Sequence, residues 1–280
     1  MSDTEEICGD LPMPPWRRIL YLWRNLKRNV LGRHQCGTHE RWTPDRRQID
    51  GFPVDRASAV RVLTESFIVH ELPRYVSARD ISVLDIGCGS GRLRHVLSEG
   101  GLSGRYTGID TDGRRFTSAS PDEPFAVTLI EADATDIELK EMFDIIISVS
   151  ALEHVPDDMA LLKNVERNLK PGGIQIHFVP AGSSLLLYLW HGFRQYNAKY
   201  ISTRFVQRCH TVIHLGGFPS FLVHALFITI GEIILRIPAR RALRPLYGLL
   251  NKAAIMSDRL LPFLAPTAVI IQANSKNGID

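Results

Sequence analysis

Apolar and polar residues follow two different periods along this chain, and the change comes near residue 80. From there to the C-terminus, short apolar runs alternate with amphipathic stretches. Such alternation is typical of a parallel sheet with helices on both faces. The predicted strands are 81–86, 105–109, 126–130, 143–148, 173–179 and 267–273. The pattern therefore predicts an α/β fold.

Before residue 80 the apolar period is helical. In residues 16–31, Trp16, Ile19, Trp23 and Leu26 recur at three- and four-residue steps and predict one helical face. Six basic residues and no acid lie between Arg17 and Arg33. A basic amphipathic helix with tryptophans is suited either to a membrane interface or to capping the main domain, and both interpretations stay open.

Several other segments have weaker patterns. Residues 1–15 are predicted to be a disordered leader, 42–53 a linker and 55–76 a helix. The histidines and cysteine of 34–39 lack a second ligand cluster, which favours a loop over a zinc site.

The apolar run 221–230 is predicted to be a buried strand, since Glu232 and Arg236 make it too short for a membrane segment. Residues 231–263, broken by prolines, predict a helical insertion.

Composition limits the functional classes only loosely. The chain has 280 residues, a net charge of +3 and 22% charged residues, which are ordinary values for a globular protein. The charge is too small to indicate nucleic-acid binding by itself. Four scattered cysteines and an acidic start without a secretory signal favour a cytoplasmic protein.

The most informative stretch is 81–91, an apolar strand followed by three alternating glycines and an amphipathic helix. This geometry brings a ligand against backbone N–H groups. Asp85, two residues before the first glycine, would repel a pyrophosphate but suits an ammonium or sulfonium. No Lys-Ser/Thr follows the glycines, which disfavours a nucleoside triphosphate. S-adenosylmethionine is the ligand that fits best.

The pattern Asp85-x-Gly87-x-Gly89-x-Gly91 resembles motif I of the class I S-adenosylmethionine-dependent methyltransferases. The segments 106–110, 130–136, 143–157 and 169–173 extend the resemblance, which is nearest to the subgroup with ubiquinone-pathway, natural-product and glycan methyltransferases. It implies a Rossmann-like, seven-stranded, mostly parallel sheet whose last strand is antiparallel. In that fold, 216–228 would supply the sixth strand.

The resemblance also implies which residues bind the cofactor. Asp110 would accept the ribose hydroxyls, with Asp112 as the alternative, and Asp133 and Ala134 would contact adenine. Ser148 and Ser150 would lie beside the methionine moiety. The full set implied is Asp85, Gly87, Cys88, Gly89, Gly91, Asp110, Asp133, Ala134, Ser148 and Ser150.

Methyl transfer also requires one proton to be managed. His154 is the candidate base and Glu153 its orienting partner, although His154 could instead only fix its loop. Some ubiquinone-pathway relatives carry an extra acid three residues before this Glu and bind a divalent metal. Ser150 stands there in this chain, so no metal is predicted. The acceptor is expected near 180–205, where His191 and Tyr196 are secondary catalytic candidates.

These inferences lead to a division into residues 1–55, an extension with the basic helix, and 56–280, a methyltransferase domain with an insertion at 231–263. The expected activity is O-methylation of a small, lipid-linked, quinone-like or glycan acceptor, with peripheral membrane contact through 16–31 at the inner face of the membrane. The alternatives are an RNA or protein methyltransferase, a non-catalytic S-adenosylmethionine-binding module and, most weakly, a nicotinamide-dependent oxidoreductase.

Overall fold

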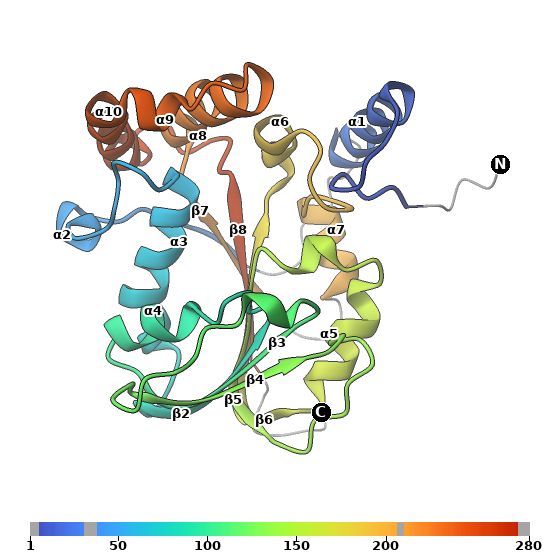
Figure 1. Cartoon of the computed structure of the whole chain (residues 1–280), viewed down its shortest axis with the longest axis vertical. Coiled ribbons are helices and arrows are strands. Elements are labelled where there is room, and N and C mark those ends of the chain that lie inside the picture. Colours follow the sequence, from blue (N-terminus) through green and yellow to red (C-terminus); the bar gives the residue numbers. More distant parts are fainter. Residues whose placement is uncertain (1–5, 31–37, 206–209, 274–280) are drawn as a thin grey trace.

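An eight-stranded sheet forms the centre of the protein (Figure 1). The computed structural model describes residues 6–30, 38–205 and 210–273. The strand order is β1-β7-β8-β6-β5-β2-β3-β4, and only β8 runs antiparallel to its neighbours. The strands are β1 (Thr38–Trp42), β2 (Asp80–Ile86), β3 (Ser103–Asp110), β4 (Phe125–Glu131), β5 (Phe143–Val149), β6 (Leu169–Pro180), β7 (His210–Leu215) and β8 (Thr267–Ala273).

Helices cover both faces of this sheet, so the predicted α/β fold with a mostly parallel sheet is confirmed. The longer helices are α1 (Pro15–Val30), α3 (Ala59–His70), α4 (Leu93–Glu99), α5 (Asp158–Glu166), α7 (Ala198–Arg204), α8 (Phe218–His224) and α10 (Arg244–Ser257). The single-turn helices are α2 (Arg46–Ile49), α6 (Leu185–Tyr188) and α9 (Ala239–Ala242). Short 3-10 turns are η1 (Leu72–Arg74), η2 (Gly113–Arg115), η3 (Leu152–His154) and η4 (Gly182–Ser184), and η5 (Ala225–Ile234) is a π-helix that continues α8.

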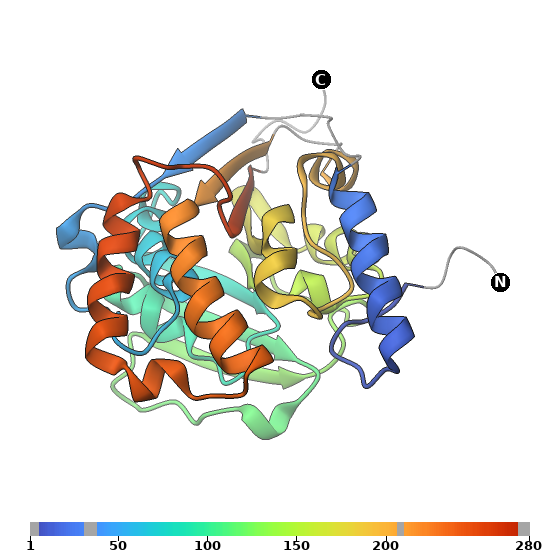
Figure 2. The ribbon, with the colours of Figure 1, turned by 90° about the horizontal axis from the view of Figure 1, so that it is seen from above.

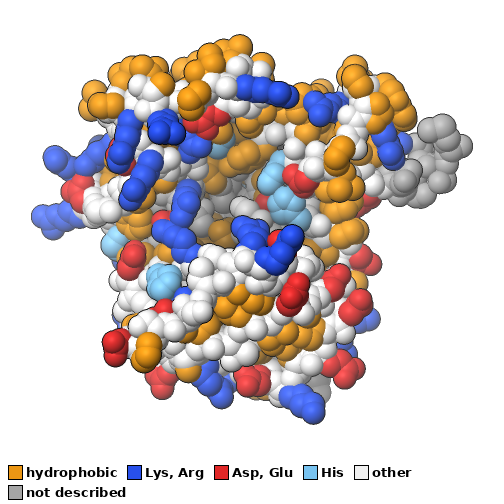
Figure 3. Space-filling view, in the orientation of Figure 1, with side chains coloured by type: hydrophobic (Ala, Val, Ile, Leu, Met, Phe, Trp, Pro, Cys, Tyr) orange, Lys and Arg blue, Asp and Glu red, His pale blue; other side chains and the backbone are white. Residues whose placement is uncertain are grey.

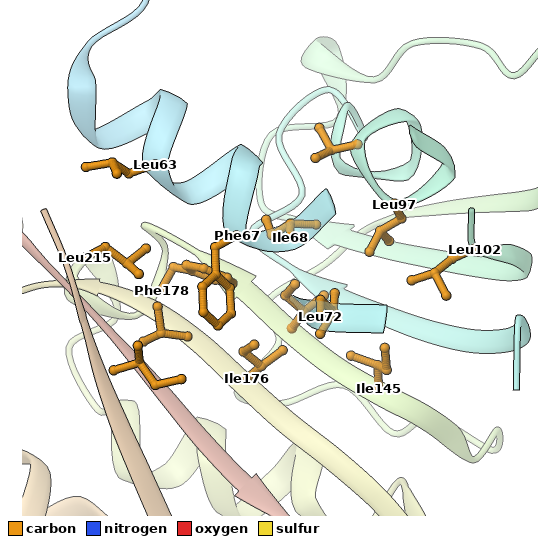
Figure 4. Close-up of a cluster of buried hydrophobic side chains, with 14 of the residues drawn as sticks. Leu63, Phe67, Ile68, Leu72, Leu97, Leu102, Ile145, Ile176, Phe178 and Leu215 are labelled. Atoms are coloured by element: carbon orange, nitrogen blue, oxygen red, sulfur yellow. The ribbon is translucent and has the colours of Figure 1, made fainter. Parts of the chain in front are cut away.

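Two hydrophobic clusters hold these layers together, one on each face of the sheet. Because side chains alternate along a strand, Ile145 and Ile147 of β5 enter the first cluster and Ile146 the second. In the first cluster, Phe67 of α3 packs edge-on against Phe178 of β6, with ring centroids 5.8 Å apart (Figure 4). The packing fixes α3 over the middle of the sheet.

The predicted strand at 221–230 is wrong. These residues are helical, in α8 and η5, and the corresponding strand is β7, directly before Gly216. Leu222, Leu226 and Ile230 stay exposed at four-residue steps, which is a helical repeat. A short apolar run does not by itself distinguish a helix from a buried strand, and Pro219 in the first turn favours the helix.

Part of the predicted disordered leader is ordered: residues 6–14 have a defined structure, while 1–5 lie outside the described residues. Residues 6–14 pack against the segment after β6, where the Gly9 N–H donates to the Gly192 carbonyl at 2.6 Å. The predicted linker contains the capped helix α2. Strand β1 pairs with β7 and was not predicted; His39 lies in it, while His34 and Cys36 lie outside the described residues. The division at residue 55 stays a prediction.

Three other helical predictions are confirmed by the structure. Helix α1 falls within one residue of 16–31, α3 lies inside 55–76, and the insertion 231–263 contains α9 and α10. Viewed from above, α1, α6, the α8–η5 helix and α10 lie next to one another at one end of the sheet (Figure 2). None of the helices within the described ranges is both long and apolar enough to cross a bilayer.

Candidate active site

The glycine turn between β2 and α4 has the predicted strand–turn–helix geometry. Gly87, Gly89 and Gly91 all have positive φ angles, of 70°, 57° and 76°. A Cβ atom on Gly87 would lie 2.5 Å from the Ala151 Cβ, so glycine is required there both for backbone conformation and for space. The N–H groups of Gly87 and Cys88 donate to the Ile109 carbonyl at 2.8 and 3.0 Å. The turn is thereby tied to the end of β3.

Asp110 lies at that strand end and faces the turn. One carboxylate oxygen, Oδ2, accepts the Gly89 N–H at 2.8 Å, and the other accepts the Asp112 N–H at 3.0 Å. Asp110 also lines a pocket of about 690 Å³, within the range of roughly 300–1,000 Å³ usual for ligand sites. The side chain of Asp112 instead pairs with the Arg114 guanidinium. Asp110 is therefore the better placed of the two candidate acids.

This first pocket brings together residues from four strand ends. The predicted cofactor and catalytic residues that line it are Gly87, Asp110, Asp133, Ala134, Ser150 and His154. The Asp133 Oδ1 atom accepts hydrogen bonds from the Thr135 N–H and hydroxyl at 2.9 and 2.8 Å. Within the described residues, that leaves Oδ2 for a donor on a ligand.

A second pocket, of about 340 Å³, adjoins the first because Gly87 and Ser150 line both. Asp85 and Cys88 lie in its wall, as does Tyr188 of α6. Burial raises the pKa of Asp85 to about 7, although the Tyr106 hydroxyl donates a hydrogen bond to its carboxylate and opposes that rise. Burial also raises the pKa of Cys88 to about 12, so this thiol stays protonated and is a poor nucleophile.

The structure does not bring every predicted cofactor residue to a pocket. Ser148 is fully buried, its hydroxyl shares a 2.9 Å hydrogen bond with His177 Nδ1 in the core, and it lines neither pocket; its contact with the methionine moiety stays a prediction. Gly89 and Gly91 shape the turn without lining either pocket. Ser150 has a positive φ of 50°, a strained conformation for a residue other than glycine.

His154 ends the turn η3 on the wall of the first pocket, and its partner is unexpected. Its Nδ1 lies 2.9 Å from a carboxylate oxygen of Asp10, from the N-terminal segment. Burial alone would raise the pKa of Asp10, but His154, the Gly192 N–H and His191 together hold it below its ordinary value. No local motif marks Asp10, and the sequence prediction missed it.

Glu153 was predicted to orient His154, but it lies nearer to His191. Its Oε1 is 3.6 Å from His191 Nε2 and 4.0 Å from His154 Nε2, and the side chain is fully buried. Burial would lower the pKa of His191, but the carboxylates of Glu153 and Asp10 raise it above the ordinary value. The two imidazole rings meet edge to face, with centroids 4.6 Å apart.

The cluster of Asp10, His154 and His191 could perform two kinds of chemistry. Asp10, His154 and His191 each offer a ligand atom, and these atoms lie within 4.8 Å of one another, so they could hold a divalent cation as well as move a proton. The sequence had predicted no metal there. Tyr196, the other secondary candidate, is fully buried and donates its hydroxyl to Asp158 at 2.8 Å, which makes it a structural residue.

Comparison with known proteins identifies the family. A family model described as a methyltransferase domain matches residues 84–177, the part of the chain that carries the glycine turn and His154. The ubiquinone biosynthesis O-methyltransferase of Pseudomonas entomophila (strain L48) is 31% identical over 126 residues, 43% of this chain and 53% of that protein. Residues 84–177 therefore contain a methyltransferase domain, and these matches support the class I S-adenosylmethionine-dependent methyltransferase family.

Other relatives agree with this family. The Pseudomonas putida (strain F1) ubiquinone biosynthesis O-methyltransferase is 27% identical over 170 residues, 59% of this chain and 68% of that protein. A crystal structure of an S-adenosylmethionine-dependent methyltransferase from Archaeoglobus fulgidus matches with a TM-score of 0.50 and 18% identity, over 76% of this chain and 94% of that one. That likeness shows the fold. The match spans about half the length of the first curated relative.

Proposed function

We propose that this methyltransferase-family chain transfers a methyl group from S-adenosylmethionine to an oxygen of a small acceptor. The observation that carries the proposal is His154, paired with Asp10 and placed on the wall of the pocket that begins at the glycine turn. When bound, S-adenosylmethionine supplies an electrophilic methyl group on a sulfonium. What the protein must add is orientation and one proton acceptor.

The residues of the two pockets fit that cofactor. The Asp110 carboxylate has two oxygens, each already fixed by one backbone N–H, and so has lone pairs left for a vicinal diol. Asp133 and Ala134 would meet the adenine ring. Asp85 is a buried acid whose ionised form needs a cationic partner, which the ammonium of the methionine moiety would supply.

His154 is the residue we assign to proton transfer. With its proton on Nδ1, the ring donates to Asp10 and keeps a lone pair on Nε2. Nε2 can then take the proton of an acceptor hydroxyl as the oxygen attacks the methyl carbon. Asp10 fixes the ring and stabilises the imidazolium that forms, which makes Asp10 a positioning residue. Glu153 and His191 form a second acid–imidazole pair beside them.

The acceptor class follows from the second pocket and from the relatives. Its wall combines aliphatic side chains such as Val60 and Ile68 with the Tyr188 ring, which suits a phenolic or quinone-like ring better than a sugar. Ubiquinone biosynthesis O-methyltransferases are among the relatives. These features support a quinone-like, lipid-linked acceptor.

A methylation assay tests the proposal. The full chain is incubated with methyl-labelled S-adenosylmethionine and, in separate reactions, with a prenylated catechol, an unprenylated catechol, bulk RNA and casein. We expect label in the catechols, more in the prenylated one, and none after the His154→Gln substitution. A parallel reaction with a chelator distinguishes proton transfer by His154 from a bound cation. Label in RNA or casein alone, or cofactor binding without turnover, would overturn the proposal.

A further inference from the structure

The exposed apolar side chains of the described residues gather at one end of the molecule. They belong to α1 with the residue Leu11 before it, to α6, and to residues 222–264; the remaining exposed large hydrophobic side chains are Tyr75, Met142 and Met159. Figure 3 shows hydrophobic side chains along the upper edge formed by these helices. We call this surface, made of α1, α6 and 222–264, the apolar face. Exposed apolar side chains gathered on one surface mark interaction sites.

Helix α1 has the reverse orientation of an ordinary surface helix, because its apolar side faces solvent and its polar side faces the protein. Its apolar residues Trp16, Ile19, Trp23 and Leu26 are 46–69% exposed. Its protein-facing side instead buries polar groups: the Tyr21 hydroxyl donates to the His191 carbonyl at 2.7 Å. A helix that turns its tryptophans outward and hydrogen-bonds inward is built to contact another apolar phase on its outer side.

The η5 and α10 helices repeat this arrangement. In η5, Thr229 is buried and donates its hydroxyl to the Leu187 carbonyl, while Ile230 and Ile234 are exposed. In α10, Asn251 is buried and donates to the Ala57 carbonyl, while Leu249 is 69% exposed. The same orientation in three separate helices indicates a common contact surface.

The charges of the apolar face are mostly basic. Helix α1 contains five basic residues and no acid, and residues 222–264 contain six basic residues and two acids, Glu232 and the buried Asp258. Figure 3 shows Lys and Arg side chains beside the hydrophobic edge. Three of the six basic residues in 222–264 are paired within the protein: Arg240 with Glu232, Arg244 with Asp55 and Lys252 with Asp50. A cationic rim around exposed Trp, Leu and Ile is complementary to anionic lipid head groups.

We propose that the apolar face docks on an anionic bilayer, with the outward side chains of α1, η5 and α10 inserted at the level of the head groups. Because no helix of the described part can cross a membrane, the contact is monotopic. A second copy of the chain is a poorer occupant, since it would bring two cationic rims together.

This docking bears on the acceptor. Tyr188, the last residue of α6, lines the second pocket, so α6 connects the apolar face with that pocket. An acceptor anchored in the bilayer by a lipid tail would present its head group on this side. This part of the inference rests on the proposed function, whereas the docking itself does not.

Vesicle sedimentation with the full chain tests the docking. Vesicles of phosphatidylcholine alone are compared with vesicles that also contain phosphatidylglycerol. We expect binding to the mixed vesicles that weakens with salt, and a loss of at least about tenfold in affinity for Ile19→Asp or Leu249→Asp. The matched control is Met142→Asp, an exposed hydrophobic side chain outside the apolar face, which should bind like the wild type.

Three results would overturn the docking: no vesicle binding by the wild type, equal binding by all four proteins, or a wild-type dimer in sedimentation velocity that the two face variants dissolve. S-adenosylmethionine titration of the same variants separates this inference from the proposed function. Cofactor binding without vesicle binding rejects only the docking, and vesicle binding without cofactor binding rejects only the methyltransferase activity.

Discussion

Asp85 is a carboxylate held in a fully buried position at the end of β2. Burial raises its pKa to about 7, so near neutral pH the side chain is divided between its neutral and ionised forms. The Tyr106 hydroxyl donates to it but carries no charge. The ionised form therefore lacks a cation in the described structure, and a cationic ligand would stabilise it.

The affinity for S-adenosylmethionine should rise between about pH 6 and about pH 8, because the neutral Asp85 loses its proton in this range and then attracts the ligand ammonium. Titration calorimetry at several pH values measures how the affinity for S-adenosylmethionine changes with pH. The Asp85→Asn variant keeps an acceptor for Tyr106, so it should bind more weakly and without this pH dependence. If the affinity of the wild type and that of Asp85→Asn changed equally with pH, Asp85 would not contact the ligand's cation.

Asp10 and His154 differ in their predicted effects on turnover. His154→Gln removes the proton acceptor and should lower kcat by at least about a hundredfold. Asp10→Asn keeps the ring but loses the charge that stabilises the imidazolium, so kcat should fall, but by less than in His154→Gln; single-turnover assays of both variants measure the difference.

In both variants the KM for S-adenosylmethionine should stay near the wild-type value. Asp112→Asn is the matched control and should keep the wild-type kcat. This acid lies two residues beyond Asp110, but its side chain pairs with Arg114. An unchanged kcat for Asp10→Asn would restrict Asp10 to holding the N-terminal segment.

At the level of elements, Asp258 at the end of α10 holds the start of α8. Both its carboxylate oxygens accept from Ser220, from the N–H at 2.9 Å and from the hydroxyl at 2.6 Å. All of these groups are buried. The contact thereby joins α8 to the end of α10 across 38 residues of sequence.

Asp258→Ala should therefore leave two donors of Ser220 buried without acceptors and destabilise the protein by about 1–3 kcal/mol. Urea unfolding followed by circular dichroism measures the change. The exposed Asp122→Ala should stay within about 0.5 kcal/mol of the wild type. Equal unfolding midpoints for the two variants would mean that packing alone holds α8.

The elements near the glycine turn were predictable from sequence because each strand there carries a buried apolar run bounded by turn residues. β2 and β5 are examples. β1 was not predictable, since Thr38–Trp42 is polar, lies at the sheet edge and shows no clean alternation. The run 221–230 is as apolar as a buried strand, and its periodicity does not distinguish a helix from a strand. The sequence prediction therefore assigned a strand where the structure has a helix.

The site was predictable only where a local motif marks it. Asp110 and the glycines follow strands directly, and the resemblance covers them. Asp10 meets His154 across 144 residues, and no spacing rule connects an acid of a polar leader with a turn after β5. The motif did not indicate the orientation of the Ser148 side chain, which strand alternation turns into the core, toward His177.

At the scale of the whole molecule, the parallel sheet explains why the site lies at the carboxyl ends of the strands. The carboxyl ends of β2, β3, β4 and β5 meet at one edge. Asp110 is the last residue of β3, and Gly87, Asp133 and Ser150 follow the other three ends. Open α/β sheets bind ligands at this edge. The N-terminal segment and the residues after β6 then add Asp10 and His191 beside it, and the helices of the apolar face lie at the same end.

The most direct test of this account is titration calorimetry of the wild type and Asp110→Ala with S-adenosylmethionine and, separately, with NADH. The account predicts saturable binding of S-adenosylmethionine to the wild type, binding at least about tenfold weaker in the variant because a charged acceptor is lost, and no binding of NADH. Equal affinity of both proteins for S-adenosylmethionine would contradict the assignment of the pocket. Binding of NADH in its place would contradict the cofactor itself.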